Sequence, residues 1–416
     1  MLIELERAPA KQPANYGRQR VAYLVPEFPG QTDIFYWREI KDLEKLNVDV
    51  CLFSTRQPDK SIRSHLWTKE AVFRTTYLRD LPLRDLLASL KHLPVLLQRD
   101  IRRSLVKAGP RAIVDALLSL TFATKLVRSC HNKTIAHVHA HSCGRTALIC
   151  ALANRIGNID YSLTLHGPMQ DYGNLQDLKW RRAKFATVIT QRLLREVQTA
   201  LGSDMPDRVV VQGMGIDPNR LKRPTSYVPY EGQGKLRIFS CGRLHVVKGH
   251  QILIDAAAKL SDRGIDLEVF IAGQDEHQGN GFKKVLQQQI NELGLKEKVH
   301  LLGAVSDEEV RQQLLACHIF ALASFSEPLG VVYMEAMSCE VPTIATHAGG
   351  VPELIDHDVD GLLVPPHDAD ALANQIEQLA ASPSKAEKLA TNGRRKVEKR
   401  FSSMRGAQTL ARLTFG

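Results

Sequence analysis

The stretch that decides the fold is Ser324 to Pro352, which reads S-F-S-E-P-L-G-V-V-Y-M-E-A-M-S-C-E-V-P-T-I-A-T-H-A-G-G-V-P. The apolar run 319–323 before it predicts a buried strand. A proline and Gly330 then break the pattern, and the segment 331–338 that follows favours a helix. A strand that passes through a loop into a helix is the repeating unit of an α/β fold.

Two carboxylates flank the start of this expected helix. Glu327 falls in the loop, and Glu335 falls one to two turns into the helix. Eight helical residues rise about 12 Å, which is too far for the pair to share one small metal or one proton. The two could hold the ends of a long ligand, with the N–H groups of Leu329 to Val332 facing an anion between them. Two solvated surface glutamates would be the better interpretation of an isolated E-x7-E pair.

Length and charge limit the classes of protein. The chain has 416 residues, which predicts two domains. Hydrophobic residues make up 44% and charged residues 24%, the balance of an ordinary globular protein. The net charge of +10 is compatible with an acidic membrane surface, a phosphorylated substrate or nucleic acid. Nucleic acid is not expected as a partner, because the sequence has neither a concentrated basic run nor a recognised binding motif.

Cysteines and apolar segments bear on location. The seven cysteines are scattered without a C-x-x-C pair, so neither a zinc ribbon nor a disulfide framework is expected. No apolar segment reaches the roughly 18 residues of a membrane-spanning helix, and the first residues are charged too early for a signal peptide. We therefore expect a cytoplasmic protein, with peripheral attachment at the inner face of the membrane left open. Residues 1–19 are polar and predict a loose leader.

The first half begins with a mononucleotide-binding pattern. A strand at 21–25, a loop at 26–33, a helix ending at Leu46 and a strand at 48–53 follow one another. The loop lacks G-x-G-x-x-G, which argues against a dinucleotide-dependent oxidoreductase. Gly30 could let the backbone approach a phosphate, or it could be an ordinary turn glycine.

The segment 81–128 is apolar and basic. From Arg79 to Arg128 the chain carries ten Lys/Arg against four Asp/Glu, with helical spacing broken by prolines. Such a segment could make a peripheral contact with the anionic face of a bilayer. The preferred interpretation is a set of helices packed on the sheet with a solvated basic face, because such faces are common on soluble proteins.

Histidines gather around two expected strands. Alternation over 135–141 predicts a strand with three histidines on one face, and Cys143 follows it. Alternate positions on one strand seldom supply three ligands of a tetrahedron, so we expect no metal and a strand that delivers His141 to the mouth of a cleft. A strand at 160–165 ends in His166, at the strand edge where α/β sheets bind ligands.

The second half restarts the pattern after an expected linker at 222–235. A strand at 236–240 leads into G-R-L-H-V-V-K-G, residues 242–249. Arg243 and Lys248 could clamp a diphosphate, since arginine offers a planar fork and lysine a point charge. Further strands are expected at 185–188, 209–211, 267–273 and 299–303, and a final helix at 385–413.

Several of these strings together resemble one enzyme family. E-P-L-G-V-V-Y-M-E-A-M followed by P-T-I-A-T-x-A-G-G-V-P-E-L-I resembles the signature of the retaining glycosyltransferases of family four, which have the GT-B fold. G-R-L-x-x-x-K-G and T-x-H-G resemble motifs of the same family. Y-L-V-P-E-F-P-G-Q-T-D-I-F-Y-W-R-E-I resembles the bacterial exopolysaccharide and colanic-acid-type branch. The resemblance runs from about Val21 to the C-terminus and is stronger in the second half.

The resemblance implies an α/β chain of GT-B fold, with two Rossmann-like domains facing a central cleft. Residues 1–222 would form the acceptor-side domain, completed by a C-terminal helix at about 400–416, and 235–399 would bind the nucleotide sugar. The implied activity moves a hexose-type sugar from a UDP- or GDP-sugar to a glycan or lipid-linked acceptor, with retention and without a metal or cofactor. The alternatives are a phosphorylase, an epimerase or an inactive sugar-nucleotide-binding subunit.

The resemblance also implies residue roles. It gives His166 and Glu327 to the reacting sugar and Glu335 to the ribose. The remaining residues would bind the donor phosphates (Gly30, Arg243, Lys248, Gly330, Val331 and Val332) or line the base-binding region (Gly273, Leu301 and Leu302).

Overall fold

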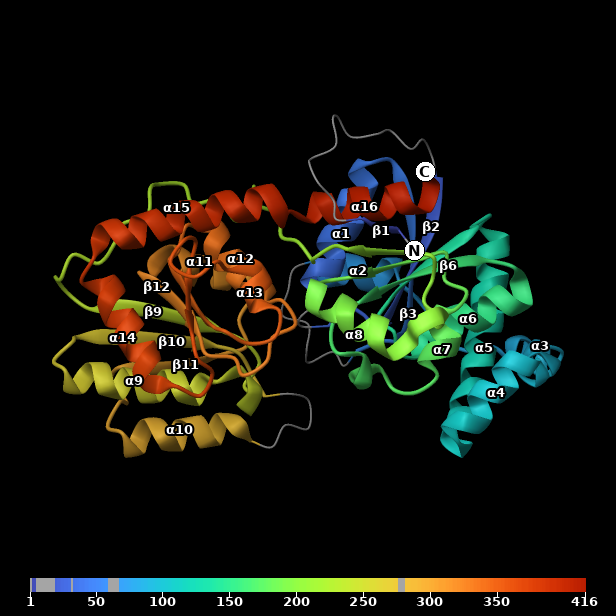
Figure 1. Ribbon diagram of the computed structural model, residues 1–416, viewed down its shortest axis with the longest axis horizontal. Coiled ribbons are helices and arrows are strands. Elements are labelled where there is room, and N and C mark those ends of the chain that lie inside the picture. Colours follow the sequence, from blue (N-terminus) through green and yellow to red (C-terminus); the bar gives the residue numbers. More distant parts are fainter. Residues whose placement is uncertain (1, 5–18, 31–32, 59–66, 276–280) are drawn as a thin grey trace. The chain divides into compact units, whose positions relative to one another are not determined.

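The computed structural model describes residues 2–4, 19–30, 33–58, 67–275 and 281–416. The chain divides into two compact units. Unit 1 comprises Met1–Met214 with Ser403–Gly416, and unit 2 comprises Gly215–Ser402. In each unit the described strands form one parallel sheet with helices around it (Figure 1).

Unit 1 is built on an eight-stranded sheet of order β1-β8-β7-β6-β5-β2-β3-β4, as far as the structure describes the chain. Its strands are β1 (Leu2–Glu4), β2 (Gln19–Glu27), β3 (Val48–Arg56), β4 (Thr76–Tyr77), β5 (His137–His141), β6 (Asp160–Leu165), β7 (Phe185–Val188) and β8 (Arg208–Val211). Its α-helices are α1 (Ile34–Lys45), α2 (Thr68–Arg74), α3 (Leu83–Leu90), α4 (Arg99–Ala108), α5 (Pro110–Asn132), α6 (Arg145–Gly157), α7 (Gln176–Trp180), α8 (Gln191–Leu201) and α16 (Ser403–Phe415). Short 3-10 helices are η2 (Leu93–Leu97), η3 (Met169–Tyr172) and η4 (Gly202–Asp204).

The C-terminal helix belongs to the core of unit 1. Ala407, Leu410 and Leu413 of α16 are buried in the same cluster as Trp37 and Ile40 of α1. Figure 1 shows the two helices side by side, although they come from opposite ends of the chain. Apolar burial of this kind fixes α16 to the unit in which the chain begins.

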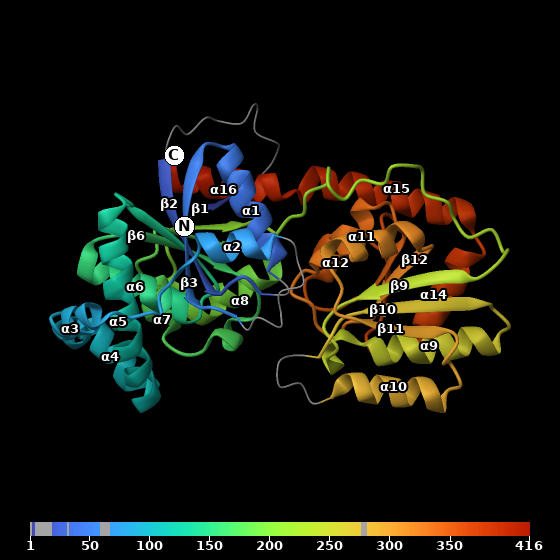
Figure 2. The same cartoon turned by 180° about the vertical axis from the view of Figure 1, so that it is seen from behind.

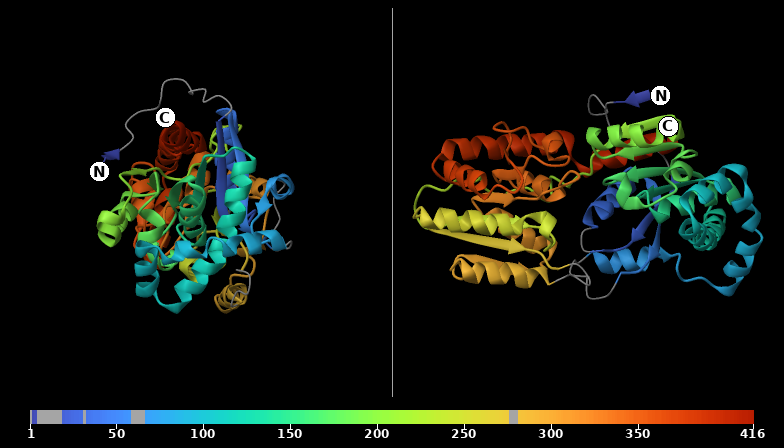
Figure 3. Two further views of the ribbon diagram at one scale, coloured as in Figure 1. Left: turned by 90° about the vertical axis from the view of Figure 1, so that its right-hand side faces the viewer. Right: turned by 60° about the horizontal axis from the view of Figure 1, so that its bottom comes forward.

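Unit 2 is built on a six-stranded sheet of order β11-β10-β9-β12-β13-β14 within its described residues. Its strands are β9 (Leu236–Cys241), β10 (Leu267–Ala272), β11 (Val299–Gly303), β12 (Ile319–Leu322), β13 (Thr343–Thr346) and β14 (Leu362–Val364). Its helices are α9 (His250–Asp262), α10 (Phe282–Glu292), α11 (Asp307–Ala316), α12 (Val331–Ser338), α13 (Val351–Leu354), α14 (Ala369–Ala380), α15 (Pro383–Arg400) and the 3-10 helix η5 (Val246–Lys248). Figures 2 and 3 show the strands of this unit running side by side among its helices.

The α/β fold class predicted from the sequence is confirmed: two Rossmann-like domains, each with a parallel sheet. Individual elements agree closely. The strands predicted at 160–165 and 185–188 coincide with β6 and β7, and the helix predicted at 331–338 coincides with α12. These segments are short apolar runs bounded by turn residues, for which local pattern and tertiary burial agree.

Two predictions of local structure are wrong. The single helix expected over 385–413 is broken between α15 and α16, because the Phe401 carbonyl accepts the Ile216 N–H at 2.9 Å and Ser402 pairs with the same residue. The loose leader expected over 1–19 contains β1, which pairs in parallel with β8. The rest of that expected leader, apart from Gln19 at the start of β2, lies outside the described residues.

The segment expected to be a linker, 222–235, packs as part of unit 2. The Arg223 guanidinium donates to the backbone oxygens of Cys339, Leu315 and Leu314 at 2.8–3.1 Å. The Tyr227 hydroxyl donates to the His318 backbone oxygen at 2.7 Å. The division between the units falls earlier, between Met214 and Gly215.

Candidate functional site

Lys248 and Glu327 meet in unit 2. Lys248 ends the short helix after β9, and Glu327 lies in the loop after β12. β9 and β12 are neighbours in a parallel sheet, so the loops at their carboxyl ends lie at one edge. The Lys248 Nζ lies 2.5 Å from the Glu327 Oε2, and the two side chains are only 17% and 12% exposed. Lys248 and Glu327, which the sequence analysis assigned to the same ligand, therefore form an ion pair.

The two loops are fixed to each other by backbone contacts. The Phe325 N–H and the Ser324 hydroxyl both donate to the Val247 oxygen, at 2.7 and 3.1 Å. Gly249 has a φ of +67°, and a Cβ there would lie 1.9 Å from the Ala323 oxygen. Only a glycine permits this close approach, so the G-x-x-x-x-x-K-G spacing serves the packing of the loop as well as its charge.

The A-G-G segment holds the backbone of Glu327. The Gly350 N–H donates to the Glu327 oxygen at 2.8 Å. Gly349 has a φ of +62°, and a Cβ there would lie 2.1 Å from the same oxygen. The conformation of Glu327 therefore depends on residues of the following loop, after β13.

The N-terminus of α12 lies beside this pair. Its N-cap, Gly330, has a φ of +95° and supplies no side-chain cap to the first turn. The backbone N–H groups of Val331 and Val332 are consequently available to an anion at the positive end of the helix dipole. The Tyr333 hydroxyl donates to the Leu322 oxygen at 3.1 Å, which ties the first turn of the helix to β12.

Glu335 and Arg243 are both near the end of β9. Arg243 lies two residues after the end of the strand and is exposed. Burial and then the Glu335 carboxylate raise the pKa of the Cys241 thiol to about 12, which places Glu335 close to the last residue of β9. The structure thus brings both residues to the strand edge that carries Lys248 and Glu327.

The expected base-binding region borders the same loop. A Cβ on Gly273, whose φ is +155°, would lie 1.9 Å from the Gly242 oxygen, so this turn packs against the residue before Arg243. Between β10 and β11 the register shifts, with Ile271 opposite Leu301 and Ala272 opposite Gly303, so Leu302 is the extra residue of a bulge. Bulges of this kind redirect side chains and are common beside binding sites.

His166 lies in unit 1 and ends a chain of polar side chains. Its Nε2 lies 2.9 Å from the Nδ1 of His141, and the two rings are nearly parallel with centroids 5.1 Å apart. The Nε2 of His141 lies 3.3 Å from the Glu39 carboxylate, an ion-pair distance whose alignment falls short of a hydrogen bond. The Tyr23 hydroxyl donates to Glu39 at 2.7 Å.

The carboxylate of Glu39 fixes the direction of this chain. An ionised carboxylate only accepts, so it favours a proton on the His141 Nε2. The His141 Nδ1 then accepts from the His166 Nε2, and the His166 Nδ1 is left as an acceptor. That Nδ1 is buried and has no hydrogen-bond partner among the described residues. Burial, and then His141, lower the pKa of His166 well below its usual value, so the ring is neutral.

The other two histidines of β5 are bound within the sheet. His137 and His139 both contact the Ser162 hydroxyl at 2.7 Å, and His139 also contacts the Thr164 hydroxyl at 2.8 Å. Burial lowers the pKa of His137 to about 3. In the described part of the chain no group of three or more His, Cys, Asp or Glu side chains is arranged to hold a metal ion.

Gly30, the other expected phosphate-binding residue of unit 1, already has an acidic partner. Its N–H donates to the Asp33 carboxylate at 2.6 Å. A phosphate bound at this N–H would have to replace that carboxylate.

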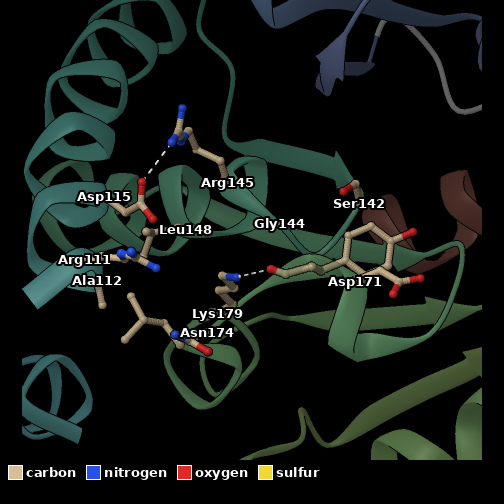
Figure 4. A pocket seen from close by; sticks show the side chains of 12 residues that line it. Arg111, Ala112, Asp115, Ser142, Gly144, Arg145, Leu148, Asp171, Asn174 and Lys179 are labelled. Carbon is tan, nitrogen blue, oxygen red and sulfur yellow. Dashed lines mark hydrogen bonds and ion pairs between the residues drawn. The ribbon is translucent and has the colours of Figure 1, made fainter. Parts of the chain in front are cut away.

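Unit 1 also contains a pocket of about 470 Å³ that the sequence analysis did not identify. Figure 4 shows its lining, in which Arg145 pairs with Asp115 at 2.8 Å and the Lys179 Nζ donates to the Tyr172 oxygen at 2.9 Å. Burial lowers the pKa of Lys179 to about 8. Its polar lining also includes Arg111 of α5, Ser142 after β5, Asp171 and Asn174.

Most of the residues predicted from the sequence gather in unit 2, and Gly30 and His166 lie in unit 1. The sequence analysis missed Glu39 near His166 in unit 1, and it missed Ser324 and Gly349 near Glu327 in unit 2. Gly349 had a signal, because adjacent glycines commonly mark backbone that must approach another chain segment closely. Glu39 had none, since its partner His141 lies on a different strand–helix unit.

Comparison with known proteins identifies the second half of the chain. Residues 229–396 match the family model for Glycosyl transferases group 1. The amylovoran biosynthesis glycosyltransferase AmsK of Erwinia amylovora is 30% identical over 216 residues, which are 50% of each chain. The alpha-D-kanosaminyltransferase of Streptomyces kanamyceticus is 32% identical over 151 residues, 36% of this chain and 38% of that protein. The chain thus spans about half or less of these curated relatives.

Solved structures resemble almost the whole chain. Anabaena HepE, in its crystal structure with UDP and glucose, has a TM-score of 0.73 at 21% identity, over 95% of this chain and 99% of that one. Sucrose-phosphate synthase from Thermosynechococcus elongatus has a TM-score of 0.72 at 20% identity, over 95% and 98%. These likenesses concern the fold. The chain therefore has the GT-B fold, and its residues 229–396 are a domain of the Glycosyl transferases group 1 family.

Proposed function

We propose that the chain is a glycosyltransferase that moves a hexose-type sugar from a UDP- or GDP-sugar to a glycan or lipid-linked acceptor. We assign it to the retaining enzymes of family four, in the exopolysaccharide and colanic-acid-type branch, with a role in exopolysaccharide or cell-surface glycan synthesis. One observation carries the proposal: within the group 1 domain, Lys248 and Glu327 meet beside the uncapped N-terminus of α12.

The relatives support both the donor and the pathway class. HepE has been crystallised with UDP, with UDP-glucose and with UDP and glucose. AmsK is named for amylovoran biosynthesis. A peripheral membrane contact through residues 81–128 would bring a lipid-linked acceptor to such an enzyme.

The leaving group of the proposed reaction is a nucleoside diphosphate, so negative charge grows on phosphate oxygens as the sugar departs. Lys248 has three N–H donors and its ion pair with Glu327 uses one of them. The others can meet phosphate, together with Arg243 and the N–H groups of Val331 and Val332 after Gly330. These groups stabilise the charge without requiring a metal or cofactor.

The sugar and nucleoside ends of the donor would use the remaining residues. Glu327 accepts from sugar hydroxyls, and Glu335 accepts from the ribose hydroxyls. Gly273, Leu301 and Leu302 line the base. The acceptor Nδ1 of His166 suits a hydroxyl of the reacting sugar, and Gly30 contributes a backbone N–H only if Asp33 moves. Retention is proposed from the motif resemblance.

A thermal-shift experiment tests the donor. UDP or GDP is expected to raise the melting temperature of the purified chain, because a ligand that binds only the native state stabilises it. Sugar transfer from the matching nucleotide sugar is then measured. A dependence on inorganic phosphate would indicate a phosphorylase, turnover without acceptor an epimerase, and binding without turnover an inactive subunit. Absence of any nucleotide-dependent shift would contradict the proposal.

The variant Lys248→Ala is expected to lower kcat/KM at least about 100-fold, because it removes a charge that faces the leaving group. Because the ion pair with Glu327 is largely buried, the variant is also expected to lose about 3 kcal/mol of folding stability, so turnover is compared at a temperature where both proteins are folded. Lys259→Ala is the matched control, since Lys259 pairs with Asp370 at 2.8 Å in the same unit and at an exposed position. Near-normal turnover of Lys248→Ala would exclude the proposed role.

A further inference from the structure

Exposed apolar side chains are concentrated on one part of unit 1. Seventeen large hydrophobic residues are exposed in the described chain, and eleven of them fall between residues 83 and 118. This α3–α5 surface consists of α3, η2, α4 and the first half of α5, and its exposed apolar residues are Leu83, Leu86, Leu87, Leu90, Leu93, Leu97, Val106, Ile113, Val114, Leu117 and Leu118. Figures 1 and 2 show α3 and α4 grouped with α5 at one end of the unit.

In α3 and the first half of α5 most of the large apolar side chains face outward, opposite to the usual amphipathic pattern. In α3 the polar residues Asp85 and Ser89 are buried at 1% and 5% exposure, whereas Leu87 is 57% exposed. In α5 the small residues Ala112 and Ala116 and the polar Ser119 face inward, and larger aliphatic side chains face out. Surface helices normally turn their apolar side chains to the core. The outward arrangement leaves an apolar surface far larger than scattered exposed residues would make.

The same surface is positively charged. Its seven Lys and Arg residues are all exposed, and in the described chain none of their side chains makes an ion pair or hydrogen bond (Arg84, Lys91, Arg99, Arg102, Arg103, Lys107 and Arg111). Its three acidic residues are neutralised by arginines outside the surface. Asp85 pairs with Arg128, Asp100 with Arg155 and Asp115 with Arg145. The surface therefore presents unpaired cations without unpaired carboxylates.

We propose that the α3–α5 surface docks on an anionic lipid bilayer. Aliphatic side chains interleaved with unpaired Lys and Arg suit insertion at the headgroup boundary and attraction to lipid phosphates. Nucleic acid would use the cations and leave the leucines exposed. The core of a protein interface is depleted of charged residues, whereas here seven cations lie among the apolar side chains. No helix in the described chain is long and apolar enough to cross a membrane, so the contact is a surface one.

Vesicle flotation of the full chain tests this inference without any nucleotide sugar, so its outcome is separate from that of the proposed function. The chain is expected to float with vesicles of phosphatidylcholine and phosphatidylglycerol and to float weakly with phosphatidylcholine alone. Arg102→Glu/Arg103→Glu should weaken partitioning by about thirtyfold or more, as expected for the loss of two surface cations. Lys283→Glu/Lys284→Glu on α10 changes the net charge equally and should bind as the unmodified chain does.

The apolar contribution is tested in the same way. Leu87→Ser/Leu97→Ser removes exposed side chains of the surface and should reduce binding to the mixed vesicles by about tenfold or more. Val285→Ser/Leu293→Ser removes similarly exposed side chains from unit 2 and should leave it unchanged. All four variants alter exposed positions, and unchanged melting temperatures would show that they fold.

Three results would overturn the inference. They are the absence of binding to anionic vesicles, equal weakening by the α10 controls, and a concentration-dependent dimer of the full chain that Leu87→Ser/Leu97→Ser dissociates. The last would assign the surface to a second copy of the chain.

Discussion

At the scale of single residues, the contacts of Glu39 and His141 give His166 a defined tautomer. The His141 Nε2 faces Glu39 at 3.3 Å, and the His141 Nδ1 faces His166 at 2.9 Å. Because the carboxylate only accepts, both histidines are expected to carry their proton on Nε2. Glu39 and His141 are thus positioning residues for a ring that would contact the sugar.

Glu39→Gln is expected to shift His141 and His166 toward a mixture of tautomers, because an amide can donate or accept. Nitrogen-15 NMR of the histidine rings measures the tautomer directly, whether or not the chain is active. Turnover should fall by about 10- to 100-fold with little change in KM for the donor, the pattern of a misaligned hydrogen bond. Glu70→Gln is a control, since Glu70 makes an ion pair with Lys41 at 2.6 Å away from the histidines. An unchanged ring spectrum in Glu39→Gln would refute the assignment.

The sequence could predict those site residues that occur in recognisable local strings. It could not predict residues whose role depends on a tertiary contact. Arg243, Lys248, Glu327 and Glu335 occur in strings whose meaning is local, so their common location in unit 2 follows from neighbouring strands. The sequence analysis did not predict that Lys248 would pair with Glu327. The role of Glu39 depends on a tertiary contact between β5 and the first helix, which no local pattern reports.

At the scale of elements, glycines decide how closely the loops around Glu327 approach. Gly349 combines a φ of +62° with a Cβ position 2.1 Å from the Glu327 oxygen. Gly264, also in unit 2, has a φ of +83° with nothing within 4 Å of its Cβ position. Both glycines have a left-handed backbone, but only Gly349 has an atom close to its Cβ position. Comparing their alanine variants therefore separates the cost of backbone strain from the cost of the steric clash.

Gly349→Ala is expected to destabilise unit 2 by about 3 kcal/mol or more, because the methyl group must displace a backbone oxygen. Gly264→Ala should cost about 1 kcal/mol, the strain of the backbone alone. Denaturant unfolding followed by circular dichroism gives both values. Gly349→Ala should also lose the thermal shift with nucleotide, because the loop of Glu327 moves. Equal losses of unfolding free energy in the two variants would mean that the loop of Glu327 moves away from the new methyl group at no energetic cost.

Element prediction succeeded where local pattern and packing agree and failed where packing alone decides. The start of the helix at 331–338 could be predicted because Gly330 breaks the preceding pattern. The interruption of the last helix at Phe401 is imposed by a hydrogen bond from Ile216, and the packing of 222–235 is imposed by Arg223. Neither contact has a signal in the local sequence.

At the scale of the whole molecule, composition predicted two domains but not the faces that their helices present. The segment 81–128 was correctly recognised as apolar and basic. Its preferred interpretation, helices with an ordinary solvated basic face, does not account for the outward leucines of α3 and α5. Helical periodicity defines a stripe of residues, and only tertiary structure shows which stripe meets the core.

Buried histidines make unit 1 sensitive to acid. Burial lowers the pKa of His137 and of His141 to about 3, and lowers that of His139 well below its usual value. In the unfolded chain these rings titrate near their ordinary value of about 6.5. Between these values the unfolded state binds more protons, so stability is present above about pH 6.5 and is lost as pH falls toward 3. All four histidines of this group, His166 included, belong to unit 1.

Unfolding of unit 1 should therefore become easier from pH 7 to pH 5, by up to about 1.4 kcal/mol per pH unit for each buried histidine. Intrinsic tryptophan fluorescence isolates the effect, because all three tryptophans, Trp37, Trp67 and Trp180, lie in unit 1. His137→Gln removes one titrating ring. The unfolding free energy of unit 1 should therefore change less steeply with pH, even if the protein is less stable at pH 7. His131→Gln removes an exposed histidine of the same unit and should leave the slope as it is. A His137→Gln slope equal to that of the unmodified chain would show that this ring is already charged, or already accessible, in the folded state.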